Sequence, residues 1–137
     1  MKIRDVMSKD VQVARPTDTV QDVASRMSAG DFGFIPVADG DRLVGTITDR
    51  DIALRAVGAG LGPTATVAQT MTGKVTTVLD TDPLQTALDA MSRFKIRRLP
   101  VVDKHERLVG VVSLGDLSIR VKEKYAGEAL ETISQPG

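Results

Sequence analysis

Two matching stretches of this chain decide its fold: Leu43-Val-Gly-Thr-Ile-Thr-Asp-Arg-Asp51 and Leu108-Val-Gly-Val-Val-Ser-Leu-Gly-Asp116. Each has a Leu-Val-Gly opening, an apolar middle, a hydroxyl residue and a closing aspartate. The pattern predicts a short buried strand that turns directly into a helix, with Thr48 and Ser113 as N-caps three residues ahead of the aspartates. Such a helix start gathers unpaired N–H groups and suits an anion. The motif alone leaves open whether these helix starts hold a ligand or only cap helices.

The motif belongs to an internal repeat that covers most of the chain. Aligning Pro36 with Pro100 gives an offset of 64 residues, and one extra residue in a loop of the second copy raises the offset to 65 at the motif. We expect the first copy, with its opening turn, over residues 1–62 and the second copy over residues 63–125. A C-terminal tail over residues 126–137 lacks periodicity and is expected to be partly disordered.

Each copy predicts the same series: an opening turn, a brief strand, an amphipathic helix, two strands joined by a polar turn, and a second helix. Asp82 before Pro83 predicts an N-cap followed by a proline in the first helical turn, which places the equivalent cap at Asp18. The expected ranges in the two copies are opening turns 3–7 and 67–71, first strands 11–14 and 75–79, apolar helix stripes 20–27 and 84–91, proline strands 34–38 and 99–102, and second helices 49–57 and 114–124.

The composition excludes several classes of function. Eighteen basic and eighteen acidic side chains cancel, so no net charge favours nucleic acid or an anionic membrane. The sequence shows no signal peptide and no apolar run long enough to span a membrane, so the expected location is the cytoplasm. There is no cysteine, and His105 stands in a polar turn without visible partners. We therefore expect neither a metal site nor an enzyme.

The order of elements resembles a pair of CBS (cystathionine β-synthase) domains. The resemblance is carried by Ile35-Pro-Val-Ala-Asp39 and Leu99-Pro-Val-Val-Asp103, each followed by Gly-x-x-Thr/Ser-x-x-Asp, and it covers roughly residues 1–125. It implies an α+β fold in which two β-α-β-β-α repeats pack about a pseudo-twofold axis, a Bateman-type module. It also implies a regulatory function, in which adenosine-containing ligands bind in clefts between the repeats.

The resemblance implies roles for particular residues. The motif aspartate holds the ribose hydroxyls, the motif hydroxyl meets a phosphate, and adenine lies against the first strand and proline strand of the other copy. One implied site combines Thr48, Arg50 and Asp51 with Thr77, Val78, Arg97, Arg98, Leu99 and Pro100. The other combines Ser113 and Asp116 with Val13, Ala14, Phe34, Ile35 and Pro36.

The chemistry of these residues fits the roles unevenly. A carboxylate accepts two hydrogen bonds from vicinal hydroxyls, and Arg50, Arg97 and Arg98 are candidates for charge-assisted bonds to phosphate. The first copy has Gly33-Phe34 where the second has Arg97-Arg98, so one site gains an aromatic ring and loses a phosphate partner. The alternatives are that the arginines are solvated surface residues and that Phe34 is part of the core.

We therefore expect a non-catalytic sensor of an adenine nucleotide, with AMP, ADP or ATP ahead of NAD or S-adenosylmethionine. Ligand binding would change the relative angle of the two copies, and a partner protein would read that change. Exposed apolar helix faces lead us to expect a homodimer. The alternative is a ligand-free dimerisation or interaction module whose clefts are filled by its own side chains.

Overall fold

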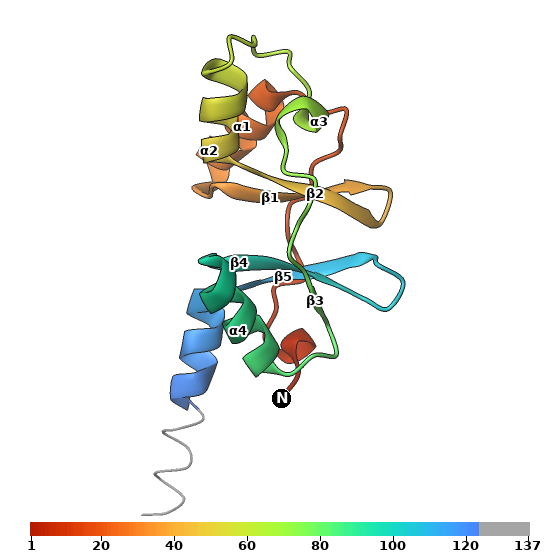
Figure 1. Cartoon of the computed structure of the whole chain (residues 1–137), viewed down its shortest axis with the longest axis vertical. Helices are drawn as coiled ribbons and strands as arrows, with labels where there is room; N and C mark the ends of the chain where they lie inside the picture. Colours follow the sequence, from red (N-terminus) through yellow and green to blue (C-terminus); the bar gives the residue numbers. More distant parts are fainter. Residues whose placement is uncertain (124–137) are drawn as a thin grey trace, which may run out of the picture.

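The computed structural model describes residues 1–123, so the tail expected over residues 126–137 lies outside the described part. Two small sheets face each other at the middle of the molecule, and the helices lie at its two outer ends (Figure 1). This arrangement confirms the expected α+β class. The elements are η1 (Ile3–Asp5), α1 (Val20–Gly30), β1 (Phe34–Asp39), β2 (Arg42–Thr48), α2 (Asp49–Asp51), the π-helical η2 (Ile52–Val57), α3 (Val67–Thr70), β3 (Val78–Leu79), α4 (Leu84–Phe94), β4 (Arg98–Val102), β5 (Leu108–Ser113) and a helix over 114–123.

The apolar stripes of α1 and α4 build the two cores, as the repeat predicts. Val23 and Met27 are buried in the core of the first copy, and Ala87 and Met91 are buried in the core of the second. Each stripe turns toward the sheet of its own copy, because residues three and four apart lie on one face of a helix.

The predicted helix caps are wrong by one residue. Thr19 caps α1 and accepts a hydrogen bond from the Asp22 N–H, while the extended residue Pro83 occupies the N-cap position of α4. The carboxylates of Asp18 and Asp82 instead accept hydrogen bonds from backbone N–H groups three residues earlier, at 2.8 and 2.9 Å. They therefore close the turn that precedes each helix.

The two sheets share one plan. β1 pairs antiparallel with β2 and β4 pairs antiparallel with β5, each with one bulge at the equivalent position. β3 pairs parallel with β4 through only two residues. The equivalent pairing in the first copy is a single bridge between Ala14 and Val37. The predicted first strands over 11–14 and 75–79 are therefore too long. Their earlier residues leave their own sheet and cross to the other copy.

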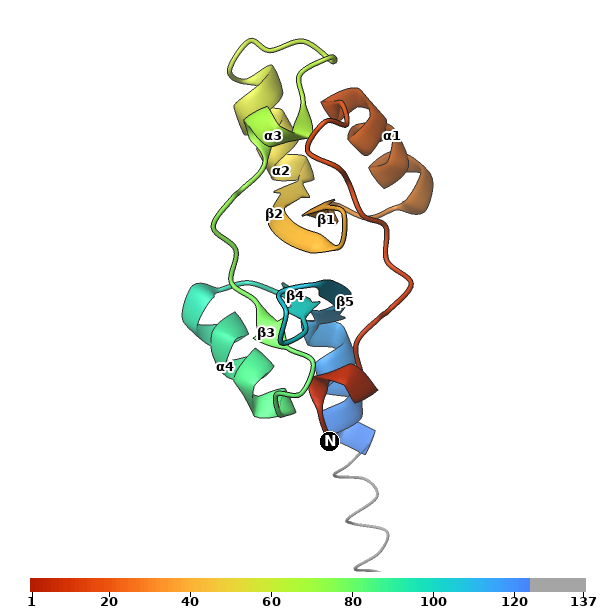
Figure 2. The ribbon, with the colours of Figure 1, turned by 90° about the vertical axis from the view of Figure 1, so that its right-hand side faces the viewer.

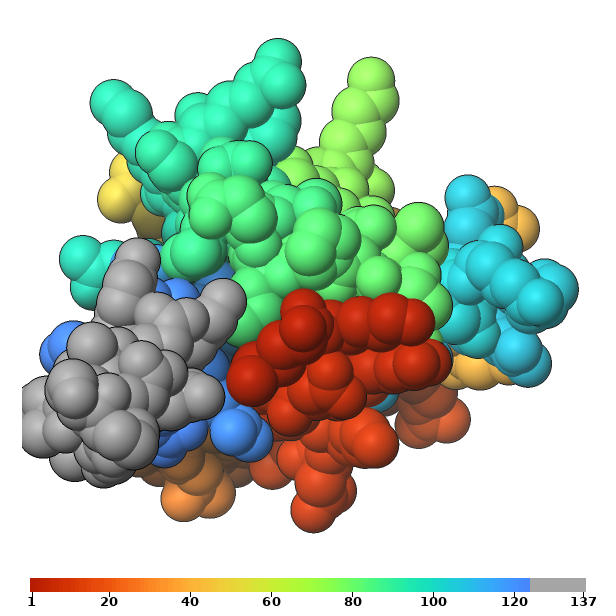
Figure 3. Space-filling model, turned by 90° about the horizontal axis from the view of Figure 1, so that it is seen from below, coloured from red at the N-terminus to blue at the C-terminus, as the bar shows by residue number. Residues whose placement is uncertain are grey.

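The opening segments of the two copies are exchanged. Ser8 forms two backbone hydrogen bonds with Val111 of β5, and Thr72 forms two with Thr46 of β2, all at 2.8–3.0 Å. The crossing segments run on opposite sides of the molecule (Figure 2), and the N-terminal segment packs against the second copy (Figure 3). Ile3 is accordingly fully buried in the core of the second copy. Each opening segment thus completes the core of the other copy.

This exchange explains the glycine of the repeated motif. A Cβ atom on Gly45 would lie 2.6 Å from the carbonyl oxygen of Thr72, and one on Gly110 would lie 2.7 Å from that of Ser8. Carbon and oxygen do not approach so closely without a shift of the backbone. Both motif positions therefore need a residue without a side chain, because the exchanged segment crosses directly over the strand.

A hydrogen-bonded turn joins β4 to β5. The carboxylate of Asp103 accepts hydrogen bonds from the N–H groups of His105 and Arg107 at 2.8 and 3.0 Å, and from Nε of Arg107 at 2.9 Å. Partial burial alone would raise the pKa of Asp103, but these hydrogen bonds and the nearby guanidinium outweigh it and hold the pKa below 3.8. The turn is therefore stabilised by the ionised form of Asp103.

Candidate ligand-binding clefts

Two clefts lie between the copies, and both are open to solvent. Their volumes are about 480 and 630 Å³, within the range of small-molecule sites. Cleft 1 is lined by Ser8, Asp10, Val11, Gln12, Phe32, Phe34, Pro36, Arg98, Val111, Ser113 and Asp116. Cleft 2 is lined by Gly33, Phe34, Thr46, Thr48, Asp49, Arg50, Thr72, Lys74, Val75, Thr76, Phe94, Ile96, Arg97, Arg98 and Pro100.

The repeat relates the two clefts. The positions equivalent to Pro36 and Ser113 of cleft 1 are Pro100 and Thr48 of cleft 2. Phe34 and Arg98 are themselves equivalent, at the starts of β1 and β4, and each lines both clefts. Each cleft draws residues from both copies, as the resemblance implies.

The first motif forms the capping box that its spacing predicts. The Thr48 N–H donates to Oδ2 of Asp51 at 3.0 Å, and the Asp51 N–H donates to Oγ1 of Thr48 at 3.1 Å. Nε of Arg55 lies 3.9 Å from the other carboxylate oxygen of Asp51. Asp51 does not line cleft 2, so in this structure its carboxylate caps the helix.

The start of α2 also lacks the free N–H groups that the motif suggested. The Asp49 N–H donates to the carbonyl of Gly33 at 3.1 Å, and the Arg50 N–H donates to Oδ1 of Asp49 at 2.9 Å. With the Asp51 N–H held by Thr48, every N–H group of α2 has an acceptor. An anion in cleft 2 would therefore meet side chains rather than the helix backbone.

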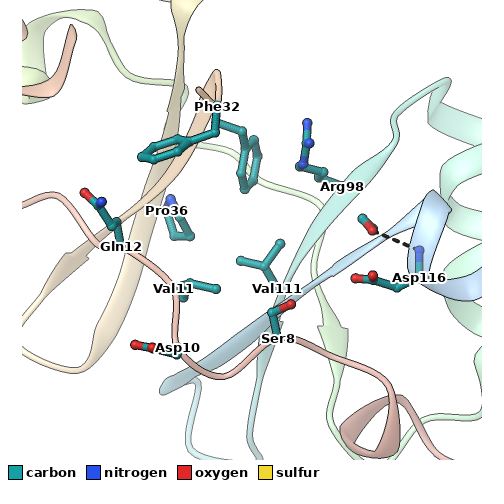
Figure 4. A pocket seen from close by; sticks show the side chains of 11 residues that line it. Ser8, Asp10, Val11, Gln12, Phe32, Pro36, Arg98, Val111 and Asp116 are labelled. Atoms are coloured by element: carbon teal, nitrogen blue, oxygen red, sulfur yellow. Dashed lines mark hydrogen bonds between the residues drawn. The ribbon is translucent and has the colours of Figure 1, made fainter. Parts of the chain in front are cut away.

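The second motif is arranged differently. The Asp116 N–H donates to Oγ of Ser113 at 3.0 Å, but within residues 1–123 no hydrogen bond or ion pair to the Asp116 carboxylate is found. The carboxylate points into cleft 1 (Figure 4). It is thus placed to accept hydrogen bonds from a ligand.

The structure brings together part of each predicted residue set. The predicted residues that line a cleft are Thr48, Arg50, Arg97, Arg98 and Pro100 in cleft 2, and Phe34, Pro36, Ser113 and Asp116 in cleft 1. Those that line neither cleft are Asp51, Thr77, Val78, Leu99, Val13, Ala14 and Ile35.

Four of the residues that line neither cleft belong to the cores. Ala14, Ile35, Val78 and Leu99 are buried in the cores, because neighbouring residues of extended backbone point to opposite faces. The crossing segments meet the clefts about two residues earlier than predicted, at 10–12 and 74–76. Asp10 and Lys74, which the repeat offset pairs, therefore line the clefts although they are not among the predicted site residues.

The two clefts differ in charge. Cleft 2 is lined by four cationic side chains and one carboxylate, whereas cleft 1 is lined by two carboxylates and one guanidinium. The described residues contain no group of three His, Cys, Asp or Glu side chains arranged to hold a metal ion. Among the helices described, none has the length and apolar character needed to cross a membrane.

The chain is thus an exchanged tandem repeat with two clefts between its copies. The CBS domain profile matches residues 3–58 and 67–123, so the chain belongs to the CBS domain family. Hypoxic response protein 1 of Mycobacterium tuberculosis is 33% identical over 135 residues, which are 97% of this chain and 94% of that protein.

Solved structures support the same assignment. A crystal structure of Hypoxic Response Protein I with two coordinated zinc ions has a TM-score of 0.80 and 34% identity, and the match covers 88% of this chain and 98% of that one. The CBS domain pair of protein MJ0100, in complex with 5′-methylthioadenosine and S-adenosyl-L-methionine, has a TM-score of 0.78 and 28% identity over 90% of this chain and 98% of that one. The protein PAE2072 from Pyrobaculum aerophilum, complexed with AMP, has a TM-score of 0.75 and 30% identity over 85% of this chain and 89% of that one.

Proposed function

We propose that this protein is a non-catalytic sensor that binds an adenine nucleotide between its repeats. The observation that carries the proposal is cleft 2, where Arg50, Lys74, Arg97 and Arg98 converge on one cavity of about 630 Å³. Four cations around one open cavity suit the phosphates of AMP, ADP or ATP. A nucleotide ligand is also consistent with the cytoplasmic location expected from the sequence.

The other walls of cleft 2 suit the nucleoside. Val75, Ile96 and Pro100 supply apolar surface, and Phe34 and Phe94 add two aromatic rings. A base stacked on one ring gains about 1–3 kcal/mol, whereas a micromolar ligand needs about 8 kcal/mol. The cations must therefore supply much of the remainder. The complexes of MJ0100 and PAE2072 support this kind of ligand, since both contain adenosine compounds.

A nucleotide in cleft 2 would bridge the copies. Thr48 and Arg50 belong to the first copy, while Arg97 and Pro100 belong to the second. A ligand that touches both copies stabilises the relative angle that fits it best, and this differential affinity is the basis of a switch. We propose that a partner protein reads this angle.

The alternative was a ligand-free module with clefts plugged by its own side chains. Both clefts are open in this structure, with polar side chains at their walls. This observation favours a ligand over a scaffold without one.

Differential scanning fluorimetry and calorimetry with adenosine, AMP, ADP and ATP test the proposal. Ligand at 100 times its dissociation constant should raise the free energy of unfolding by about 2.7 kcal/mol. Arg50→Ala should weaken the binding of ATP more than the binding of adenosine. The control Lys104→Ala also removes an exposed positive charge, but outside both clefts, and should bind like the wild type. If no adenosine compound raises the melting temperature, the proposed function is wrong.

We also propose a homodimer. An apolar groove of about 480 Å³ lies between α1 and η2, lined by residues that include Val20, Ile52, Val57 and Leu61. Val57 is 72% exposed, so a second copy packed here would bury it. Native mass spectrometry would show the subunit count, and a monomer at all protein concentrations would contradict this proposal.

A further inference from the structure

The two clefts, although related by the repeat, differ in charge at several equivalent positions. Asp10 on one crossing segment occupies the position of Lys74 on the other, and each lines its own cleft. The position equivalent to Arg97 of cleft 2 is Gly33, which brings no charge to cleft 1. The two clefts therefore have equivalent backbones but side chains of different charge.

The motif loops extend this difference. Arg50 lines cleft 2, and its equivalent beside cleft 1 is Gly115. Asp49 is the exception, because it adds a carboxylate to cleft 2 where the second copy has Leu114. Its Oδ1 already accepts a hydrogen bond from the Arg50 N–H, and its carboxylate packs against Gly33. Cleft 2 retains an excess of positive charge.

Arg98 is the one cation among the described residues that line cleft 1. Figure 4 shows its guanidinium directed away from Asp10 and Asp116, and no ion pair joins it to either carboxylate within residues 1–123. Arg98 also lines cleft 2, so phosphates bound there would attract it away from cleft 1. A phosphate in cleft 1 would thus face two carboxylates, Asp10 and Asp116, that form no ion pair within residues 1–123.

We propose that the two clefts select their ligands by charge. Cleft 2 takes an adenine nucleotide with its phosphates, and cleft 1 takes a neutral or cationic adenosine compound without phosphate. This inference rests on the proposed function and gives each cleft its own ligand class. In cleft 1 the carboxylate of Asp116 accepts hydrogen bonds from the two ribose hydroxyls, and Phe32 and Phe34 provide rings for the base. Asp10 repels phosphate and attracts a cationic substituent.

Methyl NMR can follow each cleft separately in the full chain. Val11 and Val111 report on cleft 1, and Val75 and Ile96 report on cleft 2. ATP should shift the cleft 2 methyls at concentrations about tenfold lower than those that shift the cleft 1 methyls. Adenosine should shift the methyls of cleft 1 with an affinity that added ATP does not reduce.

Two charge exchanges make the test sharper. Asp10→Lys gives cleft 1 the kind of residue found in cleft 2, and Lys74→Asp does the reverse; both side chains are exposed, and melting curves check the fold. Asp10→Lys should strengthen ATP binding in cleft 1 about tenfold, and Lys74→Asp should weaken it in cleft 2 by a similar factor. Adenosine binding should change less than about twofold in either variant, because adenosine has no charge. Asp10→Asn removes the negative charge without adding a positive one, so it should strengthen ATP binding in cleft 1 by a smaller factor than Asp10→Lys does.

The possible failures are distinguishable. The proposal of charge selection is wrong if wild-type cleft 1 binds ATP as tightly as cleft 2. It is also wrong if the affinity of cleft 1 for ATP is the same in the wild type and in the Asp10 variants. In both cases the proposed nucleotide sensing still stands. If no adenosine compound shifts methyls in either cleft, the proposed function fails and the charge selection fails with it.

Discussion

Replacing Gly45 by alanine would place a methyl group where the exchanged segment crosses β2. The new Cβ atom would lie 2.6 Å from the carbonyl oxygen of Thr72 and 2.9 Å from the sulfur of Met71. The thioether can rotate away, but the carbonyl belongs to a backbone held by two hydrogen bonds to Thr46, at 2.8 and 3.0 Å. The segment must therefore move off the strand, and these two bonds must lengthen or break.

The cost of Gly45→Ala follows from these contacts. Overpacking of this kind costs about 1–3 kcal/mol, and each weakened backbone hydrogen bond costs about 0.5–1.5 kcal/mol. Alanine recovers roughly 0.4–1 kcal/mol by restricting the unfolded chain. Together these terms span about 1–6 kcal/mol, and the middle of that range is a net loss of about 2–4 kcal/mol in the free energy of unfolding. For a chain of this length, that loss lowers the melting temperature by roughly 6–14 °C.

Gly73→Ala is the matched control, because it lies in the same crossing segment. A Cβ atom on Gly73 meets no atom within 4 Å. Thermal and urea unfolding followed by far-ultraviolet circular dichroism would compare the variants. Gly73→Ala should match or exceed the wild-type melting temperature. If the two variants melt within about 2 °C of each other, the crossing is not the tight contact described here, and the reasoning about Gly45 is refuted.

Three further predictions concern single side chains. Ile3→Ala should cost about 2–5 kcal/mol in unfolding free energy, because this third residue of the chain fills the second core; a wild-type urea midpoint would contradict the exchange. Asp51→Ala should cost about 0.5–1.5 kcal/mol by removing the hydrogen bond that its carboxylate accepts from the Thr48 N–H, whereas Asp116→Ala should mainly weaken adenosine binding in cleft 1. Calorimetry and melting curves of both variants separate the two effects. Asp103→Asn should lower the melting temperature near neutral pH. The pKa of Asp103 is lowered in the folded state, so its contribution to stability is complete above the unfolded pKa and is lost as pH falls through the folded pKa. The difference in melting temperature between the wild type and the variant should therefore shrink as pH falls through the acidic range.

The repeat made most of the fold predictable from the sequence. The stripes of α1 and α4 followed from periodicity, because each helix has one apolar face against the sheet of its own copy. The two proline strands followed from short apolar runs, which are buried almost throughout. The capping box of Thr48 and Asp51 followed from its spacing, because local hydrogen bonds depend only on neighbouring residues.

The exchange of opening segments could not be predicted from the apolar pattern. Ile3 and Val67 occupy equivalent positions, so each presents the same apolar surface to either core. A duplicated sequence does not distinguish packing within a copy from packing across copies. Gly45 and Gly110 carried the available signal, since a strand glycine often marks a close backbone approach, but a glycine does not identify the segment that approaches it.

The predicted site residues and the residues that line the clefts overlap only in part, and the exchange also accounts for part of this difference. Once residues 8–12 and 72–76 are seen to cross between the copies, Asp10 and Lys74 reach the clefts and Ala14 and Val78 enter the cores. The shift of about two residues along extended backbone changes which side chains face a ligand.

The exchanged segments also mean that neither half of the chain contains everything it needs to fold. Residues 1–62 expressed alone would lack Val67, and residues 63–137 alone would lack Ile3, so each fragment would carry an incomplete core. Two identical half-length chains could complete both cores by exchanging their opening segments in a dimer. For two such half-length chains, dimerisation would therefore be the step that completes both cores.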